Sequence, residues 1–308
     1  MDLKRFAVLT LNWNGLEVLP AMIKSLADPV EKLNGELIVF DNCSTDGSER
    51  IAFEAWGDKS WFTLIRYPEN LGFAGGANKA IKDIDAGIIV LANSDTVFLP
   101  GSLQILLDTV ESHPEAGVVG PKLLWPDGTL QRSLRDFPFP WKLIKEHIPV
   151  LGRESAVNRP HAVERKVDWL VGAVMVFRKE LFTKIGGFDE DFFFYHEETE
   201  LQYRLSLKGF SSLLVPSAEV IHIEGASARK MFGRETYLKY IQAKLKFLRK
   251  HGYTGSIVLF RLFMGLLQGC RLVSGFLCPA LSRRDIRYTA PYCRRAFNEL
   301  FRRNRRDY

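Results

Sequence analysis

The first third of the chain alternates apolar runs of strand length with amphipathic stretches. The apolar runs lie at residues 6–11, 37–40, 62–66 and 87–92. The stretch after the first run carries apolar residues at helical spacing, at Leu16, Leu19, Met22, Ile23 and Leu26. Four strand and helix units in succession predict an α/β domain with helices around a mostly parallel, Rossmann-like central sheet.

The middle of the chain continues this pattern and then interrupts it. Pro100 opens a helix that we expect near residues 99–112, and residues 117–124 predict a further strand. From residue 126 to residue 166 the sequence is rich in Pro, Arg and aromatic residues and has no clear period. A stretch of this length inside a compact domain is usually functional or mobile, so we expect a functional loop region here.

Three more strands and a helix complete the predicted domain, to which we assign residues 1–250. The strands lie at residues 168–177, 212–215 and 220–223, and the helix begins near Tyr195. Gly172 and Ala173 lie inside the first of these strands. Small residues there either ease packing or leave room for a ligand.

Residues 251–308 are predicted to form a separate helical extension. Residues 255–278 are rich in Leu, Ile, Val and Phe, but Arg261, Gln268 and Arg271 interrupt them, so an uncharged span of ~20 residues is absent. These polar residues recur on one face of a helix, opposite a broad apolar face. That pattern is typical of a helix that lies in a membrane interface. The alternative is a core or dimer helix followed by a solvated basic tail.

The distribution of charge also separates the tail from the body. The 308-residue chain has a net charge of +6, but residues 249–308 contain thirteen Lys or Arg and three acids. The tail is therefore strongly basic, which indicates a polyanionic partner, either an anionic membrane surface or nucleic acid. The four cysteines show no metal-ligand spacing, and no signal peptide is recognisable, so we expect a cytoplasmic location.

Acids follow two of the predicted strands. Asp41 follows the strand at 37–40, and Asp95 follows the strand at 87–92. Ligands of α/β folds bind outside the carboxyl ends of parallel strands, so both carboxylates are expected to face a ligand. Asp41 can accept hydrogen bonds from a nucleoside, whereas Asp95 requires a divalent cation if it faces a diphosphate. The alternatives are an Asx-turn for Asp41 and a helix cap for Asp95.

Two other stretches offer contacts for an anion or a metal. The glycine-rich residues 70–78 precede a helix, where backbone N–H groups favour anions, although the spacing matches neither a P-loop nor a dinucleotide fingerprint. His222 ends a strand and can complete a metal site, or is alternatively a structural histidine. Arg229 and Lys230 follow it and can neutralise a diphosphate.

A second acidic cluster lies further along the chain. On a helix, Glu198 is about 100° away from the side that carries Glu197, Glu200 and Arg204. Crowded carboxylates raise one another's pKa, as a general base near neutral pH requires. The alternative is a solvated acidic first turn that the helix dipole stabilises.

Six segments together resemble the successive motifs of glycosyltransferase family 2: TLNWNG, VFDNCSTDGS, NLGFAGGAN, LANSDT, GGFDEDFFFYHEETELQYRL and VIHIEGAS. They keep the family's order from about Phe6 to about His251, and the sub-branch that they resemble is that of bacterial rhamnosyltransferases. The resemblance implies a GT-A fold, a nucleotide-diphosphate-sugar donor, a divalent Mn²⁺ or Mg²⁺ ion and an inverting transfer.

The resemblance also implies roles for individual residues. Asp95, in the place of the family's DXD element, and His222 would bind the metal. The family often has Glu-Asp in its base motif, whereas this chain has Glu197 and Glu198, so both are candidates for the general base and Glu198 is preferred. The expected donor contacts are Thr10, Asn12, Asp41, Asn70, Gly72, Asn78, Asn93, Arg229 and Lys230. The expected acceptor-side residues are Trp169, Gly172, Ala173, Glu200 and Arg204.

These predictions describe a metal-dependent hexosyltransferase of cell-surface polysaccharide assembly. It would move a sugar, with rhamnose as a candidate, to a hydroxyl of a glycan or lipid-linked acceptor, and it would lie on the cytoplasmic face of the membrane as a peripheral protein. One alternative is a nucleotide-sugar binding protein without turnover. The other is a nucleic-acid binder, but the tail lacks an aromatic platform or a known module, so we expect no nucleic-acid partner.

Overall fold

A computed structural model of the chain describes residues 4–139, 142, 161–193, 195–223, 236–277 and 290–301. The chain divides into two compact units, of which the first comprises Met1–Phe137 and Glu154–Ser227. The second comprises Pro138–Arg153 and Ala228–Tyr308. It therefore includes residues 228–250, which we had assigned to the end of the α/β domain.

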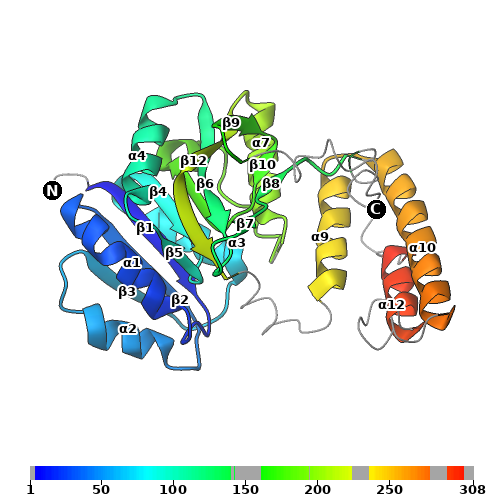
Figure 1. The fold of residues 1–308 in the computed structure, drawn as a ribbon, viewed down its shortest axis with the longest axis horizontal. Helices are drawn as coiled ribbons and strands as arrows, with labels where there is room; N and C mark the ends of the chain where they lie inside the picture. Colours follow the sequence, from blue (N-terminus) through cyan, green and yellow to red (C-terminus); the bar gives the residue numbers. More distant parts are fainter. Residues whose placement is uncertain are drawn as a thin grey trace. The chain divides into compact units, whose positions relative to one another are not determined.

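The first unit is built around a sheet to which ten strands of the described residues contribute (Figure 1). Its main path has the order β3-β2-β1-β4-β11-β6-β12-β5. The parallel neighbours at one end are β1 (Lys4–Asn12), β2 (Glu36–Asn42), β3 (Phe62–Tyr67) and β4 (Ala86–Ala92). Beyond them, β11 (Val174–Arg178) is antiparallel to β4 and to β6 (Ala116–Leu124). The long strand β12 (Ser211–His222) is parallel to β6 and antiparallel to β5 (Thr96–Phe98). The predicted mostly parallel sheet is confirmed.

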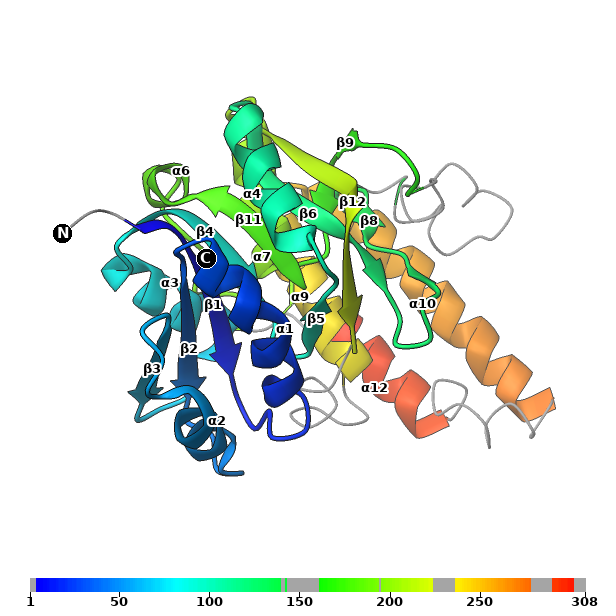
Figure 2. The same cartoon turned by 60° about the vertical axis from the view of Figure 1, so that its left-hand side comes forward.

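Helices cover both faces of this sheet (Figures 1 and 2). One face packs against α1 (Leu19–Lys32), α2 (Ser48–Trp56) and α4 (Ser102–Ser112). The other face packs against α3 (Gly72–Asp83), α6 (Lys179–Lys184) and α7 (Glu197–Leu207). Along β1, Phe6 and Val8 belong to the first core, whereas Ala7 and Leu9 belong to the second. The apolar runs are continuous because these strands are buried on both faces.

The later strands differ in detail from the prediction. Residues 168–177 form two strands, β10 (Trp169–Leu170) and β11, because the chain turns at residues 171–173. Two strands were predicted, at residues 212–215 and 220–223, but residues 211–222 form the single strand β12, with an irregularity between Val215 and Glu219. The stretch after residue 126 also contains β7 (Leu130–Gln131), β8 (Leu134–Arg135) and β9 (Arg165–Val167), of which β8 pairs with β10 in a separate sheet.

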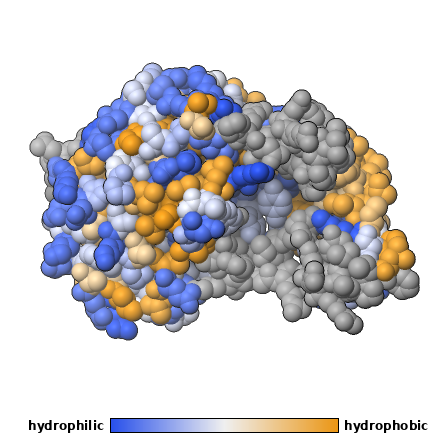
Figure 3. Space-filling model, viewed as in Figure 1, coloured by the Kyte–Doolittle hydropathy of each residue, from blue (hydrophilic) through white to orange (hydrophobic). Residues whose placement is uncertain are grey.

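The second unit contains the helices α9 (Thr236–Lys250), α10 (Thr254–Leu277) and α12 (Ala290–Phe301). Leu238 of α9 packs with Tyr292 and Ala296 of α12 in a small core. Several apolar side chains of α10 are exposed (Figure 3). Of the described helices, α10 is the one whose length and composition would allow it to cross a membrane.

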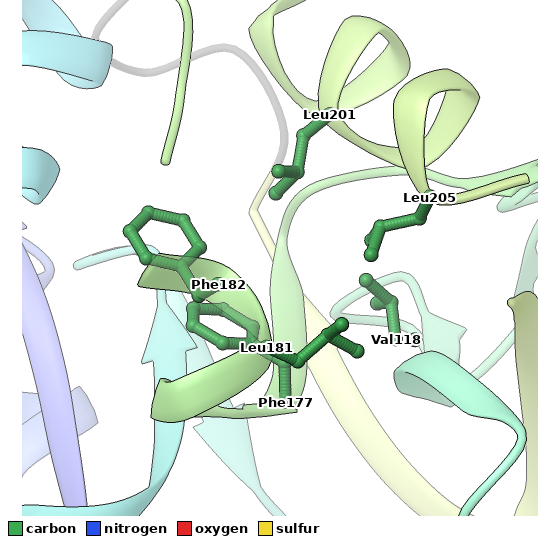
Figure 4. Close-up of a pocket in the computed structure, with 7 residues that line it drawn as sticks. Val118, Phe177, Leu181, Phe182, Leu201 and Leu205 are labelled. Atoms are coloured by element: carbon green, nitrogen blue, oxygen red, sulfur yellow. The ribbon is translucent and has the colours of Figure 1, made fainter. Parts of the chain in front are cut away.

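A small apolar hollow in the first unit lies between α6, α7 and the sheet (Figure 4). Its lining consists of Gly117, Val118, Phe177, Leu181, Phe182, Leu201 and Leu205. These residues offer no polar or titratable side chain to a ligand. We therefore interpret the hollow as a packing gap, and the candidate chemistry lies elsewhere.

Candidate active site

The carboxyl ends of β1 and β2 hold a buried polar cluster. Asn12 lies opposite Asp41 in the strand pairing. Its amide donates to Asp41 Oδ1 at 2.8 Å and to Ser48 Oγ at 2.7 Å, while Asp41 Oδ2 accepts from the backbone N–H of Ser44 at 3.0 Å. Thr10 is buried on the same side of β1 as Asn12. The structure therefore places Thr10, Asn12 and Asp41, which were predicted to contact the nucleotide-sugar donor, near one another.

The glycine-rich turn before α3 is tied to the end of β2 by two asparagines. The Asn42 amide donates to Asn70 Oδ1 at 3.1 Å and to the carbonyl of Gly72 at 3.0 Å, and it accepts from the N–H of Leu71 at 2.9 Å. Gly72 has φ of +71°, and a Cβ there would collide with Phe193. This position therefore requires glycine. Asn42, which sequence reasoning missed, shapes the turn that carries Asn70 and Gly72.

Asn78 lies further along α3 and holds a distant loop. Its amide donates to the carbonyl of Phe188 at 2.9 Å and to Glu190 Oε1 at 3.0 Å. Its Oδ1 accepts from the N–H of Phe188 at 2.9 Å. These contacts indicate a structural role, and the predicted contact of Asn78 with the donor stays a prediction.

The turn after β4 brings the two predicted metal ligands together. Oδ1 of Asp95 lies 3.4 Å from Nε2 of His222, and both side chains are buried. The carbonyl of Asp95 also accepts from the N–H of Ile223 at 3.0 Å, so the backbone fixes the pair. The N–H of Asn93 donates to the carbonyl of Ala173 at 2.8 Å.

The geometry of this pair fits a divalent cation. Two ligands that each lie about 2.1 Å from one ion are separated by roughly 3 to 3.5 Å, and the Asp95 oxygen and His222 nitrogen are 3.4 Å apart. Within the described residues, no group of three or more His, Cys, Asp or Glu side chains forms a metal site. A pair of ligands is sufficient when substrate phosphates and water complete the coordination of the ion.

The first turn of α7 encloses the predicted general base. Oε2 of Glu197 and Oε2 of Glu198 are both shielded from solvent, and neither has a hydrogen-bond partner among the described residues. Burial raises the pKa of Glu198 to about 7, although backbone N–H groups and the charge of Arg135 lower it. Burial and then the charge of Glu198 raise the pKa of Glu197 well above its usual range. A carboxylate with a pKa near 7 suits a general base.

The backbone before α7 is unusual. Tyr195 has φ of +69° and His196 has φ of +68°. Residues other than glycine rarely adopt this left-handed region, and such strain clusters at functional sites. Two consecutive strained residues directly before Glu197 and Glu198 therefore support a functional role for this turn.

Two of the predicted acceptor-side residues, Gly172 and Ala173, lie between Glu198 and the turn that carries Asp95. A Cβ at Gly172 would come within 3.1 Å of the Glu198 Cβ, so Glu198 lies directly against this glycine. The next residue, Ala173, accepts the hydrogen bond from Asn93. One short turn therefore contacts both Glu198 and the residues that lead to Asp95.

The other three acceptor-side residues make structural contacts. Glu200 is buried and accepts from Arg204 Nε at 2.7 Å, and the Arg204 guanidinium also donates to the carbonyl of Gly187 at 2.6 Å. The indole of Trp169 is buried and donates to the carbonyl of Asp136 at 3.0 Å. Their roles toward the acceptor stay predictions.

Sequence reasoning missed two residues of β7 and β8. Gln131 lies with Oε1 at 2.9 Å from His222 Nδ1, and the charge of Arg135 acts on Glu198. Strands of two residues show no hydrophobic period, so the pattern could not identify them. The Asp-Gly pair at residues 127–128 was the available signal, because such a pair is typical of a hairpin turn. Arg229 and Lys230 lie outside the described residues.

The fold is that of GT-A glycosyltransferases. A mannosyltransferase from Pyrobaculum calidifontis in complex with GDP-Man and Mn²⁺ has a TM-score of 0.58 at 15% identity, over 96% of this chain and 84% of that one. GalNAc-T7 with UDP, GalNAc and Mn²⁺ has a TM-score of 0.58 at 13% identity, over 79% of this chain and 48% of that one. At such identities the similarity concerns the fold alone, and it confirms the GT-A prediction.

The chain belongs to glycosyl transferase family 2, because the model of that family matches residues 7–186. A second family model, described as the N-terminal domain of galactosyltransferase, matches residues 154–226.

An N-acetylglucosaminyl-diphospho-decaprenol L-rhamnosyltransferase of Mycobacterium tuberculosis is 34% identical over 207 residues, which is 60% of this chain and 66% of that protein. A rhamnosyltransferase of Escherichia coli is 29% identical over 102 residues, which is 33% of this chain and 39% of that protein. The chain thus spans just under two thirds of the Mycobacterium relative, and the resemblance to family 2 is confirmed.

Proposed function

We propose that this protein is an inverting glycosyltransferase of cell-surface polysaccharide assembly. It transfers a sugar, with rhamnose as the first candidate, from a nucleotide-diphosphate-sugar to a hydroxyl of a glycan or lipid-linked acceptor. The observation that carries the proposal is the enclosed carboxyl of Glu198, whose pKa is raised to about 7 and which lies against Gly172. The names of the rhamnosyltransferase relatives support the choice of sugar and of a lipid-linked acceptor.

Glu198 is the better general base of the two candidates. It retains some exposure and contacts the turn at Gly172, whereas Glu197 is buried. Glu198 accepts the proton of the acceptor hydroxyl, whose oxygen attacks the anomeric carbon and displaces the nucleoside diphosphate on the opposite side. Inversion of configuration follows from this single displacement.

The other strand ends hold the donor. Asp41 accepts hydrogen bonds from the nucleoside, in an orientation that Asn12 fixes at 2.8 Å. Asp95 and His222 would hold Mn²⁺ or Mg²⁺. When bound, the ion supplies positive charge that stabilises the departing diphosphate.

A panel of nucleotide-diphosphate-sugars that includes rhamnosyl donors tests this function. With Mn²⁺ present, one donor is expected to raise the unfolding temperature, because a ligand at 100 times its Kd stabilises the folded state by about 2.7 kcal/mol. The same donor is expected to be consumed when a lipid-linked glycan acceptor is added. Binding without transfer or hydrolysis would instead identify a nucleotide-sugar binding protein. If no donor binds, the proposal is wrong.

We also propose that the second unit attaches the enzyme to an anionic membrane on its cytoplasmic face. The outward side of α10 carries a stripe of apolar residues that are 54% to 76% exposed, namely Val258, Leu262, Leu266, Val273 and Leu277. Gln268 is buried. Lipid would remove these apolar side chains from water, and the exposed arginines of α12, Arg294 and Arg295, would attract anionic head groups.

Flotation with vesicles that contain phosphatidylglycerol checks the membrane proposal. The double variant Leu262→Glu/Leu266→Glu is expected to lower the bound fraction on the order of tenfold or more, because burying one Leu contributes about 1.5–3 kcal/mol. Both side chains are exposed, so the fold should tolerate the change. Leu207→Glu, at a leucine that is 64% exposed on α7, is the matched control and should float like the wild type. Equal flotation of all three proteins would exclude α10 as the anchor.

A further inference from the structure

Gln131 contacts His222 on the side of the ring that faces away from Asp95. Its Oε1 lies 2.9 Å from His222 Nδ1, and its Nε2 donates to the carbonyl of His222 at 3.5 Å. Both residues are buried, each with 4% of its surface exposed. Because the amide nitrogen faces a carbonyl oxygen, the amide oxygen must face the ring, and this oxygen can only accept a hydrogen bond. This hydrogen bond therefore forms only when Nδ1 of His222 carries the ring proton.

This hydrogen bond decides what the other ring nitrogen can do. A neutral imidazole carries one N–H, so a proton on Nδ1 leaves a lone pair on Nε2. That lone pair faces Asp95 Oδ1 at 3.4 Å, which is longer than a usual N–H···O hydrogen bond of about 2.7–3.2 Å. The lone pair of His222 Nε2 and the carboxylate oxygen of Asp95 then face the same buried position, where together they can bind a cation.

The backbone holds Gln131 and His222 in fixed register. Gln131 pairs with Leu123 of β6 in the sheet. The neighbouring residue of β6, Leu124, pairs with Ile221 of β12, directly before His222. One strand therefore positions both partners of the hydrogen bond, so the ring orientation does not depend on a mobile loop.

We propose that Gln131 is a positioning residue that keeps the proton of His222 on Nδ1 and so leaves Nε2 available to bind a divalent cation with Asp95. The inference rests on the proposed metal site and adds a residue that lies outside the family motifs. Such outer partners of a metal-binding histidine fix its tautomer, and their loss typically weakens metal binding about 10- to 100-fold. Without Gln131, the neutral ring carries its proton on Nε2. This N–H then donates a hydrogen bond to Asp95, so the cation loses the His222 ligand.

The tautomer can be measured directly by ¹⁵N-edited NMR of the imidazole rings at pH 8. The chain has six histidines, and the spectrum of His222→Gln identifies the signals of His222. The wild type is expected to show a protonated Nδ1 and an unprotonated Nε2. Gln131→Leu keeps the size of the side chain but removes the acceptor, so it should show the proton on Nε2. Gln131→Glu keeps an acceptor beside Nδ1 and should retain the wild-type tautomer.

Mn²⁺ binding gives a second readout that needs no donor and no transfer. Titration with MnCl₂, followed by the EPR signal of free Mn²⁺, is expected to show about 10- to 100-fold weaker binding for Gln131→Leu. Gln131→Glu should bind like the wild type, and so should Gln104→Leu, which removes a glutamine on α4 that bonds Asp108.

A wild-type protein with its proton on Nε2 would overturn the inference, even if every variant failed to fold. Unchanged tautomer and Mn²⁺ affinity in a folded Gln131→Leu would also overturn it. Loss of transfer with every donor, while the Nδ1 proton and Mn²⁺ binding are intact, would contradict only the proposed function.

Discussion

Replacing Glu198 by Gln is expected to lower the turnover number by about 10²- to 10⁴-fold, because the amide keeps the shape of the side chain but cannot accept a proton. The measurement is the initial transfer rate at saturating donor and acceptor. Donor affinity should stay close to that of the wild type, since Glu198 lies in the first turn of α7 whereas the Asn12 and Asp41 cluster lies at the ends of β1 and β2.

Glu197→Gln is the matched control, because it makes the same chemical change at the neighbouring position. We expect it to lower the rate less than tenfold, since Glu197 is buried and Glu198 is the carboxylate whose side chain lies against Gly172. A large loss in Glu197→Gln alone would exchange the roles of the two residues. Near-full turnover in both variants, with donor bound, would show that neither carboxyl is the base.

The raised pKa of Glu198 also predicts how the rate depends on pH. Only the ionised carboxylate can accept the hydroxyl proton, so the wild-type rate should rise as pH increases through about 7. The residual rate of Glu198→Gln should lack this rise. Both profiles come from the same assay at constant ionic strength.

The same pKa shift costs stability at high pH. The folded-state pKa of Glu198 lies above the ordinary glutamate value of 4.5, so the folded protein holds a proton that the unfolded chain releases between pH 4.5 and about 7. The free energy of unfolding therefore falls as pH rises through this window. Glu198→Gln removes the penalty and should be more stable than the wild type at pH 8, by about 3 kcal/mol at most. Thermal unfolding at pH 4 and pH 8 checks the sign.

The elements that the sequence predicted well are those with a strong local pattern. Apolar runs buried on both faces predicted β1 to β4, and the polar residues after them predicted that Asn12, Asp41 and Asp95 lie at the carboxyl ends of strands. This worked because parallel strands place their carboxyl ends at one edge of the sheet. The contact between Asp95 and His222 followed only from the family resemblance, since no local pattern links the ends of β4 and β12.

Residues that depend on long-range contacts were not predictable in the same way. Glu200 and Arg204 form an ion pair on α7, and the Arg204 guanidinium also donates to the carbonyl of Gly187, 17 residues earlier in the chain. Gln131 lies in a stretch without a period, and its contact with His222 depends on the hairpin between β6 and β7. Composition and spacing do not encode such pairings, because they arise from the register of strands distant in sequence.

Replacing Asp95 by Ala is expected to lower kcat/KM on the order of 10²- to 10³-fold, because a bound cation contributes several kcal/mol and each 1.36 kcal/mol is a factor of ten. The change should also remove the dependence of donor binding on Mn²⁺, measured by calorimetry with and without EDTA. Asp108→Ala is the control, since Asp108 lies on α4 in exposed contact with Arg5. An Asp95→Ala protein that still requires Mn²⁺ would place the ion elsewhere.

A double variant separates a shared site from two independent contributions. If Asp95 and His222 bind one ion, the first substitution already removes most of the benefit of that ion, so Asp95→Ala/His222→Gln should lose little more than Asp95→Ala alone. Independent roles would instead multiply the two losses. The 3.4 Å separation of the Asp95 oxygen and the His222 nitrogen predicts the first result. A product of the two single losses would therefore contradict the shared metal site, even if each single variant were inactive.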